Sequence, residues 1–239
     1  MDDVEFIIFV TGRFHWLKTA VTYFYGKYFD VPLTFFSDRP MDGVNAVEVF
    51  PRDMHIYNEP CGKRIKDALA QLDKPLVMFG YMDLLPIREV NLELVQVLAN
   101  YMLDRGNIAR GNLWAEIQER VRYYPIVFGQ AGLSIHYISA DDPHIAGIGS
   151  THLIHALWSR EFLLGFIEDG WTLAAVERDG PTKFRKQGHW TSIATYPGLV
   201  SLCHLCYTAA PNEVRLSTIE DAEDRAYVAQ FVPGGYRIT

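Results

Sequence analysis

The sequence has no apolar run near the roughly 20 residues that a membrane-spanning helix needs. Its opening, MDDVEFIIFV, also lacks the basic residues that begin a secretory leader and carries acidic ones instead. These absences predict a soluble, cytoplasmic protein that does not insert into a membrane.

Cysteine is scarce, with 3 in 239 residues. A chain of this length does not depend on disulfides, so we expect free thiols in a reducing compartment. Cys203 and Cys206 have the spacing of half a zinc site, but no second CxxC or HxxxH pair completes a tetrahedral set. Buried thiols in an apolar strand are the favoured interpretation, and a structural zinc completed by Cys61 and scattered histidines is the alternative.

The signature motifs of several enzyme classes are missing. There is no GxGxxG, no Walker loop GxxxxGK and no GxSxG elbow, which argues against dinucleotide-binding enzymes, P-loop NTPases and α/β-hydrolases. The HxE…PCxxC pattern of zinc deaminases is absent as well. We find no internal repeat and no low-complexity segment.

The chain is rich in apolar residues: 49% are hydrophobic and 21% are charged. This balance excludes a disordered chain, a coiled coil and a collagen-like rod. The length suits one larger α/β sheet, so residues 1–239 are expected to form a single domain. The formal net charge of −7 argues against a surface that grips nucleic acid everywhere, but it leaves room for a local basic cleft.

Apolar runs alternate with helical periodicity along the first half of the chain. They predict strands at residues 4–10, 31–36, 46–50 and 76–79, and helices at 17–28, 65–72 and between Asn91 and Gly106. This alternation indicates an α/β fold with a mixed, mainly parallel sheet flanked by helices. Later segments predict short strands at 125–139, a helix capped by Ser159, a strand and turn within 171–190, and a capping box at 217–220 before an acidic helix.

The residues that follow the early strands are the first candidates for a site, because ligands of open parallel sheets bind outside the carboxyl ends of the strands. They are residues 11–13, 37–39 and 81–83. Among them, Asp83 follows a fully apolar strand. A carboxylate at such a tip suits Mg²⁺ or Mn²⁺ beside a diphosphate. A helix cap or turn is the alternative role.

Two segments give the chain a family resemblance. The span KRIKDALAQLDKPLVMFGYMDLLP resembles glycosyltransferases of the GT-A class, in which a helix leads into an apolar strand and then an acidic metal motif. The span ALWSREFLLGFIEDGWTLAAVERDGPTKFR resembles a block of small GT-A-like enzymes of bacteria and viruses. With FIIFVTGRFHWL and PLTFFSDRP, the resemblance touches most of residues 5–186, in order and spacing more than in identity. It implies a GT-A-like, Rossmann-like fold.

The resemblance implies a nucleotide-sugar donor, with a UDP sugar favoured, along the first strands. The residues implied to meet its nucleotide are Thr11, Gly12, Arg13, Ser37, Asp38 and Arg64. Asp83 would approach the diphosphate through a metal or water. Because Tyr81 and Met82 replace the family's further acids, dependence on Mg²⁺ or Mn²⁺ is expected to be weak or partial. Solvated surface charge is the alternative role for each arginine.

Glu177 is implied to be the catalytic residue. An inverting transfer needs a base that takes the proton of the acceptor hydroxyl, and a partly buried carboxylate with a raised pKa suits that role. Trp171 and Val176 supply an apolar setting. The alternative is an ion pair of Glu177 with Arg178 or Lys183 on a hairpin.

A local excess of positive charge follows Glu177. It comprises Arg178, Lys183, Arg185, Lys186 and His189. This cluster would neutralise the leaving diphosphate, with Arg178, Lys183 and Arg185 counted among the donor-binding residues. Holding a phosphate-rich acceptor and remaining solvated are the alternatives.

The acceptor is the open part of the hypothesis. His152 and Trp158 would line its pocket, with core packing as the alternative for the tryptophan. Related enzymes decorate hydroxymethylated bases of viral DNA or bacterial surface polysaccharides, so we expect DNA or a saccharide, and the host cytoplasm if the source is viral. A sugar-nucleotidyltransferase and a non-catalytic nucleotide-sugar-binding protein are the competing functions.

Overall fold

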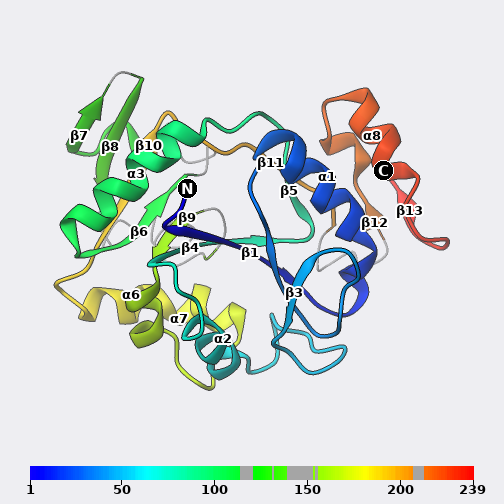
Figure 1. Cartoon of the computed structure of the whole chain (residues 1–239), viewed down its shortest axis with the longest axis horizontal. Coiled ribbons are helices and arrows are strands. Elements are labelled where there is room, and N and C mark those ends of the chain that lie inside the picture. Colours follow the sequence, from blue (N-terminus) through cyan, green and yellow to red (C-terminus); the bar gives the residue numbers. More distant parts are fainter. Residues whose placement is uncertain (114–120, 131, 139–152, 154–155, 207–212) are drawn as a thin grey trace.

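The computed structural model describes residues 1–113, 121–130, 132–138, 153, 156–206 and 213–239. At its centre lies a nine-stranded sheet with the order β3-β2-β1-β4-β9-β6-β10-β8-β7 (Figure 1). Its strands are β1 (Val4–Val10), β2 (Thr34–Ser37), β3 (Asn45–Glu48), β4 (Leu76–Tyr81), β6 (Ile108–Asn112), β7 (Ile126–Gln130), β8 (Leu133–Ile138), β9 (Ala156–Ser159) and β10 (Thr191–Tyr196). β8 and β9 run antiparallel to their neighbours, and the other strands share one direction. The α/β class and the mixed, mainly parallel sheet are thus confirmed.

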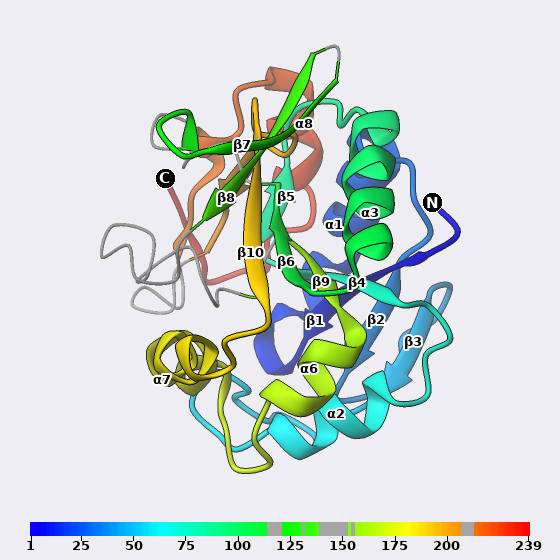
Figure 2. The same cartoon turned by 90° about the vertical axis from the view of Figure 1, so that its left-hand side faces the viewer.

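Helices cover both faces of this sheet (Figures 1 and 2). One face carries α1 (Lys18–Tyr28), α3 (Leu92–Arg105) and α8 (Ala222–Ala229), and the other carries α2 (Gly62–Leu69), α6 (Arg160–Phe166) and α7 (Leu173–Lys186). Two short sheets join β5 (Leu84–Pro86) to β11 (Leu202–His204) and β12 (Glu213–Val214) to β13 (Arg237–Ile238). In the described part of the chain, no helix is long and apolar enough to cross a membrane.

The sequence of β1 explains why helices pack on both faces. Phe6 and Ile8 pack in the core cluster of α1 and α3, whereas Ile7 and Phe9 pack in the cluster of α2, α6 and α7. Successive side chains of a strand point to opposite faces, so a strand that is apolar at every position is buried on both sides.

Two helix boundaries follow the predicted capping chemistry. The Asn91 side chain accepts a hydrogen bond from the Leu94 N–H at 3.2 Å, and α3 ends at Gly106 with a φ of +67°. The Ser159 hydroxyl accepts a hydrogen bond from the Phe162 N–H at 3.2 Å. Both predicted caps are confirmed.

Helix α7 shows that the strand and turn predicted within residues 171–190 were wrong. Thr172 caps the helix with its side-chain oxygen, and Leu173, Val176 and Phe184 are buried at helical spacing. Pro181 lies inside the helix, where it removes one backbone donor. Burial of the apolar side of the helix outweighs the turn preference of the Gly-Pro pair.

Other boundaries also differ from the predictions. The capping box at 217–220 is wrong, because residues 216–218 form the short 3₁₀ helix η3 (Leu216–Thr218) and Asp221 caps α8. The apolar pattern predicts neither β6 nor β9, and in β6 the pattern is interrupted by Arg110 and by Asn112 at the end of the strand. Single-domain organisation over residues 1–239 stays a prediction.

Candidate functional site

The strand order reverses between β1 and β4. From β1 the sheet continues through β2 to β3 on one side and through β4 on the other. Ligands of open α/β sheets bind at such a switch point, outside the carboxyl ends of the strands. Thr11 and Gly12 follow β1 at this edge, and Asp83 follows β4. The sequence therefore correctly predicted that these residues lie at the carboxyl ends of two adjacent strands.

Glu177 lies on α7 and is held by a tyrosine from another segment. Its Oε2 accepts a hydrogen bond from the Tyr57 hydroxyl at 2.8 Å. The Ala174 N–H, in the first turn of α7, donates to the Tyr57 carbonyl at 3.2 Å and fixes this segment against the helix. Burial raises the pKa of Glu177, and the hydrogen bond from Tyr57 offsets only part of that rise. A carboxylate with a raised pKa is a stronger base than an exposed one.

Tyr81 ends β4 with a hydroxyl that is buried and has no hydrogen-bond partner among the described residues. Its pKa lies well above the usual range, first because the hydroxyl is buried and then because the carboxylates of Glu177 and Asp83 add negative charge nearby. The tyrosine therefore keeps its proton and lies within electrostatic reach of both carboxylates. An unpaired buried donor costs about 1–3 kcal/mol, which a ligand oxygen would recover.

Asp83 pairs with a histidine that the short sheet brings beside it. Asp83 Oδ2 and His204 Nε2 are 2.9 Å apart. The pairing of β11 with β5 places His204 opposite Leu84, and the Leu205 N–H donates to the Asp83 carbonyl at 2.8 Å. The side chains of Asp83 and His204 are 17% and 34% exposed, so the pair is open to a ligand.

A divalent cation would find few protein ligands at this position. Asp83 supplies a carboxylate oxygen and His204 an imidazole nitrogen, and both atom types ligate metals in proteins. The described residues contain no group of three or more metal-ligating side chains. The pair therefore fits a cation that takes most of its coordination from substrate phosphate and water.

Asp38 is buried and holds two loops together. Its Oδ2 accepts hydrogen bonds from the Gly12 N–H at 2.8 Å and the Asp53 N–H at 2.7 Å. Its Oδ1 contacts His15 at 2.5 Å and Arg39 at 3.0 Å. Burial by itself would raise the pKa of Asp38, but these hydrogen bonds outweigh it and hold the pKa well below the usual range.

The neighbouring residues of this loop pair are buried too. The Ser37 hydroxyl donates to the Arg39 carbonyl at 2.7 Å. Thr11 is buried at the start of the 3₁₀ helix η1 (Gly12–Leu17), which contains Arg13. Contrary to the predicted contact with the nucleotide, the side chains of Ser37 and Asp38 are fully buried and bonded within the protein. Their role in this structure is to position the backbone after β1.

The basic residues lie along a helix rather than on a hairpin. Arg178 is 73% exposed and pairs with Asp179 at 2.7 Å. Lys183 pairs with Glu168 at 3.1 Å. Arg185 is exposed and donates to Thr182. The alternative of an ion pair between Glu177 and Arg178 or Lys183 is not seen, because both cations pair with other carboxylates. Arg64 is exposed on α2.

The acceptor prediction is wrong for Trp158. This residue lies in β9 and is 0% exposed, and its Nε1 donates to the Leu153 carbonyl at 3.1 Å. An indole in this position packs in the core and has no face for an acceptor. His152 lies outside the described residues.

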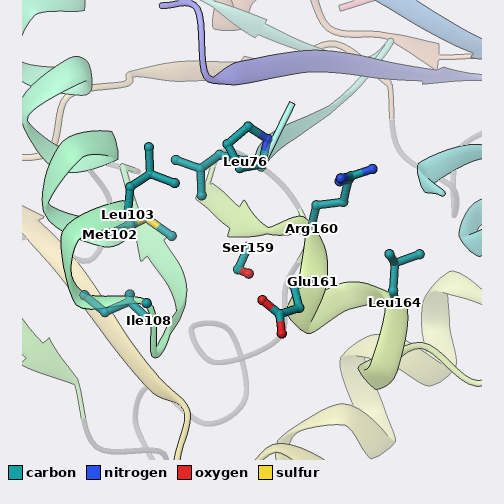
Figure 3. A pocket seen from close by; sticks show the side chains of 10 residues that line it. Leu76, Met102, Leu103, Ile108, Ser159, Arg160, Glu161 and Leu164 are labelled. Atoms are coloured by element: carbon teal, nitrogen blue, oxygen red, sulfur yellow. The ribbon is translucent and has the colours of Figure 1, made fainter. Parts of the chain in front are cut away.

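A cavity of about 550 Å³, whose lining side chains are drawn in Figure 3, lies at the other end of the central strands from the candidate site. Its lining is mainly apolar and includes Leu76, Met102 and Ile108. Leu76 begins β4, so the cavity is at the other end of that strand from Asp83. Arg160 also lines it but donates to backbone carbonyls of the α2 segment. The cavity is not part of the candidate site.

Three residues of the site escaped the sequence prediction. Tyr81 was treated as a replacement for an acid, although its place at the strand tip could have signalled it. His204 drew attention only as a residue between Cys203 and Cys206, whose spacing is that of half a zinc site, and both cysteines are buried thiols outside any disulfide. No sequence pattern signals Tyr57.

No protein-family model matches the sequence, and no curated protein matches it. Solved structures are similar at low identity. The 1–349 fragment of TarS from S. aureus is 12% identical with a TM-score of 0.48, over 80% of this chain and 57% of that one. A197 from STIV is 15% identical with a TM-score of 0.46, over 85% and 86% of the two chains. A CMP:2-keto-3-deoxy-manno-octonic acid synthetase in complex with CTP is 14% identical with a TM-score of 0.48, over 95% and 99%.

This chain thus spans just over half of the TarS fragment. Scores and identities at this level do not identify an activity, so the functional conclusion depends on the residues of the site.

Proposed function

We propose that this chain is a glycosyltransferase that moves a sugar from a nucleotide sugar, with a UDP sugar favoured, to a hydroxyl acceptor. The supporting observation is the half-buried Glu177, whose pKa is raised, within electrostatic reach of the unpaired hydroxyl of Tyr81 at the tip of β4. The sequence resemblance to GT-A enzymes and the switch point beside β4 support the same assignment.

Glu177 is proposed as the general base. Its carboxylate takes the proton of the acceptor hydroxyl while the acceptor oxygen bonds to the anomeric carbon. The bond from that carbon to the diphosphate breaks on the opposite face, so the transfer inverts the configuration. Tyr57 orients the carboxylate through Oε2. A base of this kind typically contributes about 10²–10⁴-fold to the rate.

The donor is proposed to lie across the ends of β1 and β4. The backbone of residues 11–13, fixed by Asp38, would border the nucleotide, and the Tyr81 hydroxyl would donate to a donor oxygen. Asp83 and His204 would hold Mg²⁺ or Mn²⁺, which when bound would offset the charge of the diphosphate. With so few protein ligands, the dependence on metal is expected to be partial.

The remaining assignments concern the basic residues and the acceptor. Lys183, Arg178, Arg185 and Arg64 are proposed to contribute positive charge to the donor phosphates. The acceptor is proposed to be a saccharide or a hydroxymethylated base in DNA. The salt dependence of acceptor binding distinguishes these two classes. Phosphate contacts release counterions, so the affinity of the protein for a DNA acceptor should fall steeply as the salt concentration rises.

A thermal-shift screen with nucleotides tests the donor site. A ligand at one hundred times its dissociation constant stabilises a protein by about 2.7 kcal/mol. We expect UDP or a UDP sugar to stabilise the wild type, and Tyr81→Phe to stay folded but to bind the UDP sugar more weakly. Absence of a shift with every uridine and guanosine diphosphate compound would contradict the donor site.

The competing functions give different products. A sugar-nucleotidyltransferase would release diphosphate from a nucleoside triphosphate, and a binding protein would show the thermal shift without any product. The segment TGRFHW after β1 lacks the glycine-rich basic loop of a nucleotidyltransferase.

A further inference from the structure

β6 carries a charged side chain in the interior of the protein. Arg110 is 1% exposed, and its Nε and Nη1 have no hydrogen-bond partner among the described residues. Burial lowers the pKa of Arg110 to about 9, so the guanidinium still carries its proton at neutral pH. A buried charge without a partner is strongly unfavourable, and such charges in proteins are normally paired.

The adjacent strand places a second unsatisfied group beside Arg110. Ser192 of β10 is the register partner of Arg110 and is also 1% exposed. Its hydroxyl has no hydrogen-bond partner in the described part of the chain. Paired residues of neighbouring strands project from the same face of a sheet. The guanidinium and the hydroxyl therefore enter the same layer of the protein.

A β-bulge determines which layer this is. The register between β6 and β10 shifts, because Thr191 pairs with Ile108 whereas Ser192 pairs with Arg110. Ile108 packs in the core cluster of α1 and α3. In a regular strand Arg110 would share that face, but its guanidinium lies 5.4 Å from the ring of Trp158, in the cluster of α6 and α7. Bulges that redirect a side chain in this way are over-represented next to active sites.

The contact with Trp158 does not supply hydrogen-bond acceptors for Nε and Nη1 of Arg110. A cation over an indole is attracted to the ring face, but the N–H groups of the guanidinium lie in its own plane and still need acceptors. Carboxylate and phosphate oxygens are the acceptors that arginine binds best. Such an oxygen would also accept a hydrogen bond from the Ser192 hydroxyl.

We propose that Arg110 and Ser192 form a buried oxyanion-binding site on the α6–α7 side of the sheet, for the carboxylate or phosphate group of a ligand. The site shares no residue with the Glu177, Tyr81 and Asp83 group. Anion binding at this site requires no transfer activity, so its test is independent of the proposed function.

Calorimetric titration of the whole protein with inorganic phosphate and, separately, acetate tests this site, with chloride keeping the ionic strength constant. We expect saturable binding of at least one of these anions. The anion that binds more tightly identifies the ligand group as a phosphate or a carboxylate. Arg110→Met should weaken this binding by roughly tenfold or more, the loss expected for a charge-assisted hydrogen bond. Ser192→Ala should weaken it by less. Without anion, Arg110→Met should unfold at a higher temperature than the wild type, because an unpaired buried charge is removed.

Arg105→Met is the matched control, since Arg105 also lies over an aromatic ring, at 5.3 Å from that of Tyr101, but is exposed on α3. It should bind the anion as the wild type does. If Arg110→Met does not fold, Arg110→Lys keeps the charge but loses the planar N–H set, and it should bind the anion more weakly. Absence of anion binding by the wild type, or equal binding by the wild type and the Arg110 variant, would overturn the proposal. An Arg110→Met protein that is less stable and keeps its anion affinity would show that the arginine only packs against Trp158.

Discussion

Replacing Glu177 with glutamine should stabilise the protein and stop the reaction. The amide keeps the shape of the side chain, and the Tyr57 hydroxyl can still donate to its oxygen. Because burial raises the folded-state pKa of Glu177, the fold prefers the protonated form. The stability from that preference is fully present below the unfolded-state pKa and is lost as the pH rises through the folded-state pKa. At neutral pH the wild type therefore carries a cost that Glu177→Gln lacks.

The expected size follows from general stability scales. A gain of about 0.5–2 kcal/mol is usual for one stabilising substitution. For a chain of this length, each kcal/mol raises the Tm by about 2–4 °C. Loss of a general base should lower kcat by about 10²–10⁴-fold. The assays are thermal unfolding, at neutral pH and below the pKa of an exposed glutamate, and sugar transfer at saturating donor.

The exposed Glu89 offers a control, since Glu89→Gln should change neither quantity. The stability difference for Glu177→Gln should disappear at acidic pH, where the wild-type carboxyl is protonated. Near wild-type transfer by Glu177→Gln would refute the role of general base. An equal gain in stability at both pH values would refute the electrostatic reasoning.

Three further predictions address other parts of the site. Tyr57→Phe removes a hydrogen bond that lowers the pKa of Glu177, so the acidic limb of the pH–rate profile should move to higher pH; an unmoved limb would separate Tyr57 from the base. Asp38→Asn should cost about 1.5–3 kcal/mol at neutral pH, as expected for lost charge-assisted hydrogen bonds. Because the folded-state pKa of Asp38 is depressed, the stability that Asp38 contributes is lost as the pH falls through that pKa. Urea unfolding at several pH values should therefore show that the free energies of unfolding of wild type and Asp38→Asn converge toward acidic pH. A difference that stays constant with pH would contradict this linkage. A chelator should lower transfer only in part, and His204→Ala should abolish the response to added Mn²⁺; complete loss in chelator would contradict the small ligand set built on Asp83.

The sequence predicted the carboxyl ends of the early strands better than it predicted the helices in the second half of the chain. β1 and β4 are apolar at nearly every position and end at residues that break the run, so their carboxyl ends can be read directly from the chain. Helix α7 was hidden because Gly180 and Pro181 form a strong turn signal. Its cap at Thr172 and its buried apolar side are tertiary facts that override this local preference.

The site itself was predictable only in its local parts. Asp83 could be placed because it follows a strand, whereas His204 reaches it from a strand 121 residues away. The same holds for Tyr57 and Glu177, which are 120 residues apart in sequence. Periodicity and spacing describe near neighbours along the chain, so contacts of this kind need the folded structure.

The most direct test of the central claim is to identify the products after incubation of the protein with UDP and GDP sugars and candidate hydroxyl acceptors. Mass spectrometry should detect a nucleoside diphosphate and a glycosylated acceptor in equal amounts, and NMR of the glycosylated acceptor should show inverted configuration at the anomeric carbon. Both products should be nearly absent with Glu177→Gln. A protein that binds a nucleotide sugar tightly but leaves every one intact, without transfer or hydrolysis, would contradict the claim that this site is a glycosyltransferase.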